Sequence, residues 1–342
     1  MKITKGIIVI IVSCLGFATN LGAQDFNYTQ YYLNLPAVNP GFTGMEDFWD
    51  LKLSFRQQGV NNFDARNKSL YISTYGPVNS SASSSMKNNS LRLSDPNSYN
   101  NLESNRGTRK KLLRRHGIGG MLFNRDLGAY QSFNASFNYA YHLPVSRTHH
   151  LSFGTSIRYS GRQIGISGLM VRDVVNDQTY QQLVQSGKGR MDMMIVDFGT
   201  ALYSDKGYVG LSSTSLISYA LGISDFNSTD IRTYSLQAGR FMRLGANLEL
   251  SPVINVDYNA ATGVSGGGSA RLRYRSMVYA GAGYQSNGKA SGMLGFTMSG
   301  KYNLNYSYDH YFGPLQGFNV TMHEVVFGIT LFNKYGLNSS IW

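Results

Sequence analysis

The feature that most constrains this chain is an alternation of apolar and polar residues that repeats along most of its length. In one clear example, Phe133, Phe137 and Tyr139 fall on one face while Asn134 and Asn138 fall on the other. A period of two places successive side chains on opposite faces of a β-strand. The same alternation recurs at 151–160, 248–258, 271–275 and 302–309. The pattern predicts an all-β fold.

About fourteen segments carry this alternation, and many approach the ~10 residues that a tilted membrane-spanning strand needs. Their polar faces hold mostly Ser, Asn, Gly and Thr, which is typical of an enclosed lumen, and tyrosines recur near strand ends, as in an aromatic girdle. A soluble β-sandwich or β-barrel is the alternative, because its strands also have one apolar face and show the same alternation of apolar and polar residues. We predict a transmembrane antiparallel β-barrel of about 14 strands. The expected strands are 48–58, 67–77, 116–125, 130–143, 149–161, 191–204, 206–213, 232–243, 246–258, 268–275, 277–286, 290–299, 302–310 and 322–332.

The lengths of the connections support a membrane barrel, in which short periplasmic turns alternate with longer external loops. If the N-terminus is periplasmic, the connections after strands 4, 6, 8, 10 and 12 are short, as this rule requires. The longer loops are expected at 162–190, 214–231, 259–267 and 311–321. The Ser- and Asn-rich segment 78–115 is an exception. With a periplasmic N-terminus it connects two strands on the periplasmic side, where a short turn is expected.

Residues 1–23 resemble a secretion signal peptide, with Lys2 and Lys5 before an apolar run that is too short to span a bilayer. Cleavage is expected after Ala23. In the alternative, residues 11–14 fit a lipoprotein box and Cys14 carries the lipid. Cys14 is the sole cysteine of the chain. Cleavage after Ala23 would therefore exclude disulfides, thiolate metal sites and cysteine nucleophiles.

The formal charge of +12 is concentrated in the insertion 78–115, while charged residues make up 15% of the chain against about 25% in soluble domains. Export makes nucleic acid an improbable partner for this charge. The insertion either docks an acidic periplasmic partner or is disordered. Its basic residues are Lys87, Arg92, Arg106, Arg109, Lys110, Lys111, Arg114 and Arg115, against Asp95 and Glu103.

No motif of the chain indicates catalysis. The six histidines are scattered over strand ends and loops, and no HExxH sequence, phosphate loop or dinucleotide fingerprint is present. The glycine-rich segment 263–269 precedes a strand, whereas a phosphate loop precedes a helix, so we expect a plain loop there. The sequence predicts a protein that is not an enzyme and has no catalytic residue, cofactor or metal site.

Residues 29–44 are too broken for a helix and too rich in proline for a central strand, yet too apolar for a disordered tail. We expect this segment either to fold into the lumen as a plug or to pack against a turn as a periplasmic strap. Pro40 and Gly41 suit the two central positions of a type II turn. In both cases we expect no open water channel.

Short motifs near the two ends of the chain resemble those of the PorP/SprF family of type IX secretion outer-membrane proteins. The middle of the chain also fits, since Asn124, Asp126 and Gly128 match an Asn-x-Asp-x-Gly turn. The chain departs from the family pattern at Gly59, where tryptophan is usual, in its long insertion 78–115 and in its tail after residue 332. The matching residues are Gln30, Tyr31, Asn34, Pro36, Asn39, Pro40 and Gly44 near the N-terminus, Arg56 and Gln58 on the first strand, and Tyr308, Asp309, His323 and Glu324 near the C-terminus.

Strand phase adds a hypothesis about three of these residues. Arg56 and Asp309 fall on inward faces near the outer ends of their strands, and Glu324 begins the last strand, which should close against the first. We expect the three to meet in the lumen as a buried charge network with a structural or partner-binding role. Their inward neighbours on the same strands are Lys52, Ser54, Asn303 and Asn305.

The resemblance implies a non-enzymatic component of type IX secretion in the outer membrane of a gram-negative bacterium, with both termini periplasmic. It would support the delivery or surface anchoring of a secreted partner with a C-terminal sorting domain, such as a large adhesin. Periplasmic secretion-ring lipoproteins and membrane lipid are further expected partners. The alternative is a porin or uptake channel, with Arg158, Arg271, Arg273 and Arg275 lining an anion path. The expected domains are a signal peptide at 1–23, a plug or strap at 24–47, a barrel at 48–332 and a tail at 333–342.

Overall fold

The structure is a computed structural model that describes residues 28–60, 63–78, 114–146, 148–165, 189–221, 231–312 and 320–333, together with residues 176, 178 and 181. The expected signal peptide, the alternative lipidation at Cys14, most of the 78–115 insertion and most of the C-terminal tail lie outside these residues. The helical segments at residues 31–42 are single turns of three or four residues, and no helix of the described chain is long and apolar enough to span a membrane.

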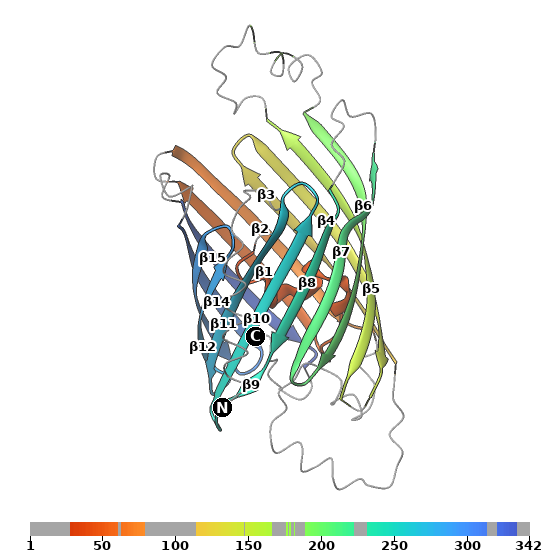
Figure 1. The fold of residues 1–342 in the computed structure, drawn as a ribbon, viewed down its shortest axis with the longest axis vertical. Helices are drawn as coiled ribbons and strands as arrows, with labels where there is room; N and C mark the ends of the chain where they lie inside the picture. Colours follow the sequence, from red (N-terminus) through yellow and green to blue (C-terminus); the bar gives the residue numbers. More distant parts are fainter. Residues whose placement is uncertain are drawn as a thin grey trace.

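The strands form one closed antiparallel barrel of fourteen spans (Figure 1). β8 and β9 pair in succession with β10, so these two short strands make up one span, and the pairing of β10 with β11 completes the ring. The strands are β1 (Trp49–Val60), β2 (Phe63–Pro77), β3 (Arg115–Leu127), β4 (Tyr130–Pro144), β5 (His150–Ile164), β6 (Arg190–Ser204), β7 (Gly207–Ala220), β8 (Thr233–Arg240), β9 (Met242–Arg243), β10 (Leu248–Asn259), β11 (Gly263–Tyr274), β12 (Val278–Gln285), β13 (Lys289–Met298), β14 (Tyr302–Tyr311) and β15 (Val320–Leu331). The predicted fold class and strand number are confirmed.

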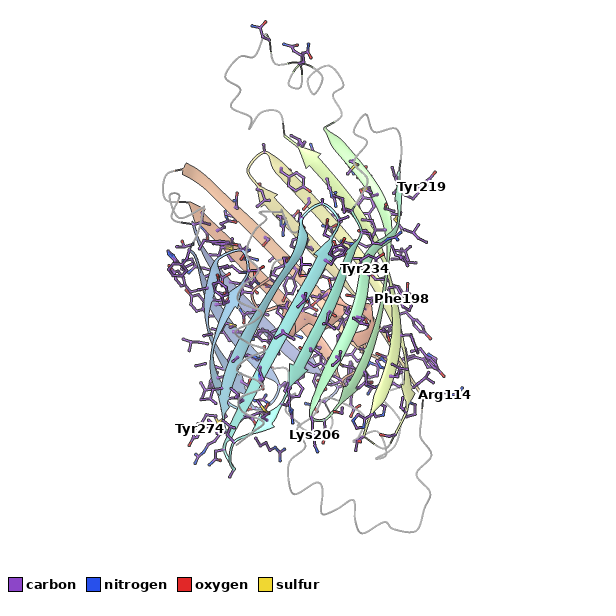
Figure 2. The ribbon with its side chains drawn as sticks, in the orientation of Figure 1. Arg114, Phe198, Lys206, Tyr219, Tyr234 and Tyr274 are labelled. Atoms are coloured by element: carbon purple, nitrogen blue, oxygen red, sulfur yellow. The ribbon has the colours of Figure 1, made fainter. Side chains whose placement is uncertain are left out.

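The barrel wall has an apolar outer face and a polar inner face. On β4 the side chains of Phe133 and Phe137 are 44% and 58% exposed, whereas Asn134 and Asn138 are buried. Phe198, Tyr219 and Tyr234 also project outward from the wall (Figure 2). A water-soluble protein would place its apolar faces inside. This distribution fits a wall surrounded by lipid, as the alternation predicted.

The two ends of the barrel differ in their connections. At the end where β1 begins and β15 ends, called here the turn end, β4, β6, β9, β11 and β13 are each followed by a short connection, as predicted. At the opposite end, called the loop end, the connection from β5 to β6 spans residues 165–189 and that from β7 to β8 spans 221–232. The last strand closes against the first, with Arg56 directly opposite Glu324.

Parts of two expected loops are strand instead. The glycine-rich segment 263–269 forms the first half of β11, because β10 pairs with it residue by residue from Asn259↔Gly263 to Leu248↔Tyr274. The expected loop 259–267 therefore shrinks to a turn at 260–262, and β7 continues to Ala220, into the first part of the expected loop 214–231. Glycine has a low strand propensity, but a fully paired neighbouring strand overrides it.

The N-terminal segment, residues 28–48, is the other part of the fold. It forms three single turns, η1 (Tyr31–Asn34), α2 (Leu35–Val38) and η2 (Pro40–Phe42), inside the ring of strands (Figure 1). Its Tyr32 and Phe42 are fully buried against inward-facing aromatic residues of the wall, including Tyr208 and Tyr279. The hydrophobic core of the protein therefore lies within the barrel.

The expected type II turn at Asn39 is wrong. Residues 40–42 form a 3₁₀ turn, in which the backbone N–H of Phe42 donates to the carbonyl of Asn39, and Gly41 does not have a positive φ. The Asn39 side chain decides the geometry, because its Oδ1 accepts a hydrogen bond from the Gly41 N–H at 2.9 Å. An Asn side chain that bonds to the backbone two residues later favours such a turn.

Candidate functional site

The side chain of Asn39 anchors the N-terminal segment to the far wall. Its Nδ2 lies 3.2 Å from the carbonyl oxygens of Thr200 and Leu211 and 3.0 Å from Oε1 of Gln237. These contacts reach β6, β7 and β8, and Asn39 is fully buried. A buried amide with every hydrogen-bonding group engaged fixes both position and orientation.

Three inward-facing glycines make room for this anchor, and we call them the glycine seat: Gly154 on β5, Gly199 on β6 and Gly210 on β7. A Cβ on Gly199 would lie 2.0 Å from Oδ1 of Asn39, and a Cβ on Gly154 would lie 2.2 Å from the carbonyl oxygen of Pro40. Real side chains do not approach so closely. The wall therefore needs glycine at these positions for the backbone turn at Pro40 to reach it.

The backbone carbonyls of the N-terminal segment are satisfied by side chains of the wall. The acceptors and donors are Pro36 O with Asn138 at 2.7 Å, Val38 O with Ser212 at 3.2 Å, Gly41 O with Ser152 at 2.6 Å, Thr43 O with His142 at 2.8 Å, and Met45 O with Arg115. Buried carbonyls need partners. The small polar residues of the inner wall supply them where the segment has no regular structure of its own.

Gly44 ends the seated part of the segment. Its φ is +67°, a conformation that favours glycine. A Cβ at this position would lie 2.4 Å from Cα of Gly117 on β3 and 2.8 Å from the carbonyl oxygen of Gly76 on β2. Both the backbone conformation and the close approach to two strands therefore require glycine.

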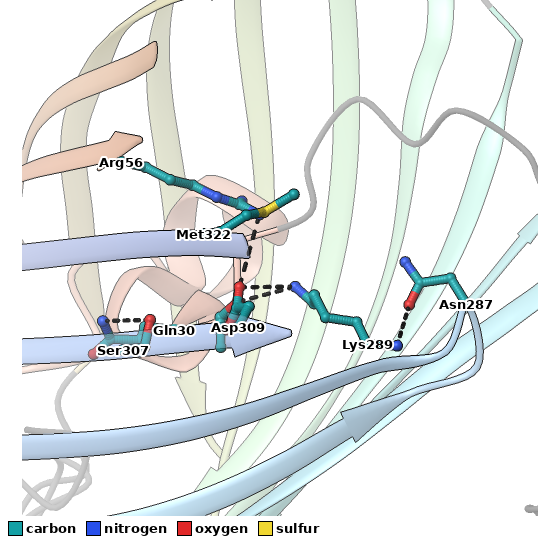
Figure 3. Close-up of polar contacts among 8 residues, drawn as sticks. Gln30, Arg56, Asn287, Lys289, Ser307, Asp309 and Met322 are labelled. Atoms are coloured by element: carbon teal, nitrogen blue, oxygen red, sulfur yellow. Dashed lines mark hydrogen bonds and ion pairs between the residues drawn. The ribbon is translucent and has the colours of Figure 1, made fainter. Parts of the chain in front are cut away.

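A second group of contacts lies at the closure seam and joins β1, β13 and β14 to the N-terminal segment (Figure 3). Asp309 Oδ2 accepts from Thr29 and lies 3.5 Å from Lys289 Nζ and 3.9 Å from Arg56. Lys289 Nζ also donates to Thr29 Oγ1 at 2.9 Å. Glu324 is buried on β15 opposite Arg56. We call Arg56, Lys289, Asp309 and Glu324 the seam cluster.

Gln30 and Tyr32 extend these contacts toward β11, β13 and β14. Gln30 Nε2 donates to Ser307 at 3.3 Å, and Tyr32 donates to Sδ of Met293 at 3.2 Å. The guanidinium of Arg271 lies 3.8 Å from the centre of the Tyr32 ring. Burial raises the pKa of the Tyr32 phenol well above its ordinary value, so the hydroxyl remains a donor.

Replacing Tyr32 with leucine is expected to lower the free energy of unfolding by about 2 kcal/mol or more, because it removes the aromatic face over a buried guanidinium. Tyr32→Phe keeps the ring and loses only the hydroxyl, so its effect should be smaller, about 1 kcal/mol. Urea titration of the folded barrel in detergent micelles measures both. If the two variants lose the same free energy of unfolding, the aromatic ring of Tyr32 does not stabilise the barrel through its contact with the guanidinium.

The structure divides the other sequence motif residues between the lumen and the outer surface. Asn34 donates to Ser73 at 3.1 Å, and Gln58 lines a cavity inside the barrel. Tyr31 packs against the aromatic core. Tyr308 and His323 face outward, where their rings lie 5.2 Å apart. Of the C-terminal motif pairs Tyr308-Asp309 and His323-Glu324, only the two acidic side chains enter the lumen.

Sequence reasoning missed Thr29, Lys289 and the glycine seat. Lys289 precedes the expected strand 290–299 by one residue, and its inward phase becomes visible only when the strand is extended to include it. The seat carries a weak signal, since Gly154, Gly199 and Gly210 interrupt otherwise regular strands. Nothing in the sequence says which residues approach them.

The arginines expected along an anion path are engaged in other contacts. Arg158 lies 3.1 Å from Asp197, and Arg273 lies 2.8 Å from Glu249. Arg271 stacks on Tyr32, and Arg275 lies in the turn after β11 at the end of the barrel. These residues do not form a continuous cationic lining.

A cavity of about 670 Å³ lies between the N-terminal segment and the loop end. Its floor includes Tyr28, Ala37 and Pro40, and its walls come from the halves of the strands nearest the loop end. Its charged lining residues are Arg56, Lys68, Arg125, Arg158, Arg162, Asp197 and Asp257. Among the described residues, no three His, Cys, Asp or Glu side chains are grouped to hold a metal ion.

Several solved outer-membrane proteins are similar to this chain. The CymD monoaromatic hydrocarbon channel has 13% identity over 92% of this chain and 93% of its own, with a TM-score of 0.47. The Pseudomonas putida toluene transporter TodX has 9% identity over 92% and 95%, with a TM-score of 0.46. Omp33 of Acinetobacter baumannii has 9% identity over 84% and 100%, also with a TM-score of 0.46.

No curated protein is significantly similar to this chain in sequence. A family model described as the type IX secretion system membrane protein PorP/SprF matches residues 20–329. This match covers the N-terminal segment and nearly the whole barrel, including every motif on which the resemblance was based. The chain belongs to the PorP/SprF family of type IX secretion system membrane proteins.

Proposed function

We propose that this protein is a non-enzymatic component of type IX secretion that holds a secreted partner at the loop end of a plugged outer-membrane barrel. The partner is a surface protein with a C-terminal sorting domain, such as a large adhesin, whose delivery or anchoring the barrel supports. In this proposal the loop end faces outward and both termini are periplasmic.

The observation that carries the proposal is the fit of the N-terminal segment to the inner wall. Asn39 reaches three strands, and the glycine seat leaves no room for side chains beneath it. The seam cluster ties Thr29 to the opposite side of the barrel. A segment held on both sides of the lumen suits a plug, and a plugged barrel suits a holding role better than transport.

The cavity supports a site for the partner at the loop end. It is bounded below by the N-terminal segment, and its lining includes many Ser, Thr, Asn and Gly residues. Such a recess could receive a loop or a chain end of a secreted domain. The family membership supplies the secretion context, and the identity of the partner is part of the proposal.

The test is a pull-down of the tagged full-length protein from native outer membranes, followed by mass spectrometry. We expect a large secreted protein with a C-terminal sorting domain. Recovery of periplasmic ring lipoproteins alone would instead indicate a component of the secretion machine. In planar bilayers the purified barrel should show no steady conductance. A conducting barrel that recovers neither kind of partner would refute the holding role and support the porin alternative.

A further inference from the structure

Exposed basic side chains follow one another around the turn end. Lys206 lies in the turn after β6 and Arg240 ends β8, and the backbone N–H of Phe241 donates to the carbonyl of Lys206 at 2.9 Å. Arg275 and Lys301 lie in the turns after β11 and β13. No ion pair joins these four residues to a carboxylate of the described chain. We call Lys206, Arg240, Arg275 and Lys301 the basic arc.

Aromatic rings lie beneath two cations of the basic arc. The guanidinium of Arg275 lies 5.3 Å from the centre of the Tyr274 ring, and Nζ of Lys301 lies 5.5 Å from that of Tyr302. Both tyrosines face outward and are partly exposed. Figure 2 shows Tyr274 and Lys206 at the same end of the barrel. Tyrosine at the end of a lipid-facing strand marks the level of the lipid headgroups.

Large apolar side chains are exposed at this same level. Leu244 and Met277 belong to turns of the turn end and are 57% and 50% exposed, and Phe332, just after β15, is 68% exposed. A surface made only for water or for an acidic soluble protein would not place such side chains beside the cations. Cations, aromatic rings and exposed apolar groups at one level are the features of a membrane interface.

We propose that the basic arc binds the phosphate groups of anionic phospholipids in the leaflet at the turn end. The cations would lie against the headgroups while the adjacent tyrosine, leucine and methionine side chains enter the upper acyl region. Each basic residue near an anionic surface contributes roughly a fivefold preference for it. This inference concerns lipid contact alone and stands whether or not the barrel holds a secreted partner.

The test compares the lipids that remain bound to the full-length barrel after extraction from vesicles of equal phosphatidylglycerol and phosphatidylcholine content, counted by native mass spectrometry. The wild-type barrel should retain phosphatidylglycerol in roughly fivefold excess or more. The variant Lys206→Gln/Arg275→Asn/Lys301→Gln should lose most of that excess, and Arg240 accounts for the preference that is left. Asparagine suits position 275, because the φ of Arg275 is 51°. The excess should also fall at about 1 M salt, where the screening length is about 3 Å.

The matched control removes three exposed cations from the loop end, in the variant Lys68→Gln/Arg190→Gln/Arg232→Gln. It makes the same change in net charge and should retain the wild-type excess of phosphatidylglycerol. An equal loss in this control would overturn the proposal, because it would show an effect of net charge alone. Equal retention of both lipids by the wild-type barrel would also overturn it and leave the arc as a surface for an acidic protein.

Discussion

We expect the wild-type barrel not to conduct ions, and we expect the replacement of Gly199 with valine to make it conduct. Gly199 faces inward on β6, and a Cβ there would overlap Oδ1 of Asn39 at 2.0 Å and approach Cδ of Pro40 at 3.0 Å. Asn39 cannot move aside while keeping its contacts with Thr200, Leu211 and Gln237, so the segment must leave its seat. The strand pairing of the wall does not depend on those contacts and should persist.

The measurement is single-channel conductance in planar bilayers, with limited proteolysis of the N-terminal segment as a second readout. The Gly199→Val barrel should open to a steady conductance and its segment should become cleavable, whereas the wild-type barrel should remain closed and protected. The control is Gly292→Val on β13, where no atom lies within 4 Å of the added Cβ. A closed Gly199→Val barrel of normal stability would show that the segment does not depend on the glycine seat.

The barrel wall was predictable from the sequence because the requirement that shapes each strand acts on neighbouring residues of that strand. Each strand has to present an apolar face to lipid and a polar face to the lumen. Apolar and polar residues therefore alternate along the sequence of the strand. The phase of that pattern also placed Arg56, Asp309 and Glu324 on inward faces. It failed at segment 263–269, where β10 imposes strand structure on glycines that carry no alternation of their own.

The seating of the N-terminal segment could not be predicted in the same way. Its carbonyls bond to Asn138, Ser152, Ser212 and other wall residues, all of them at least 70 positions away in sequence. No periodicity records such contacts, because they depend on which wall positions happen to face the segment once the ring has closed. Lys289 was missed for a related reason, since its importance depends on its distance from Asp309 on the neighbouring strand.

The second large effect is expected at Asp309, the acidic centre of the seam cluster. Asp309→Leu would leave Lys289 without its nearest carboxylate at a site where the lysine side chain is fully buried. It would also remove the acceptor for Thr29 and a carboxylate 3.9 Å from Arg56. Removing one partner of a buried ion pair costs about 3–5 kcal/mol, because the remaining charge is left uncompensated. Urea titration of the folded barrel measures the loss.

The double variant Lys289→Met/Asp309→Leu separates this cause from a simple packing defect. It removes both charges together, and Glu324 remains opposite Arg56 to balance the cation that is left. We therefore expect it to recover much of the stability that Asp309→Leu loses, because replacing a whole buried pair by apolar residues is often close to neutral. A double variant as unstable as Asp309→Leu alone would mean that packing or the Thr29 contact dominates. Arg190→Gln, which breaks the exposed pair with Asp192, should leave the urea midpoint unchanged, since solvent screens that pair.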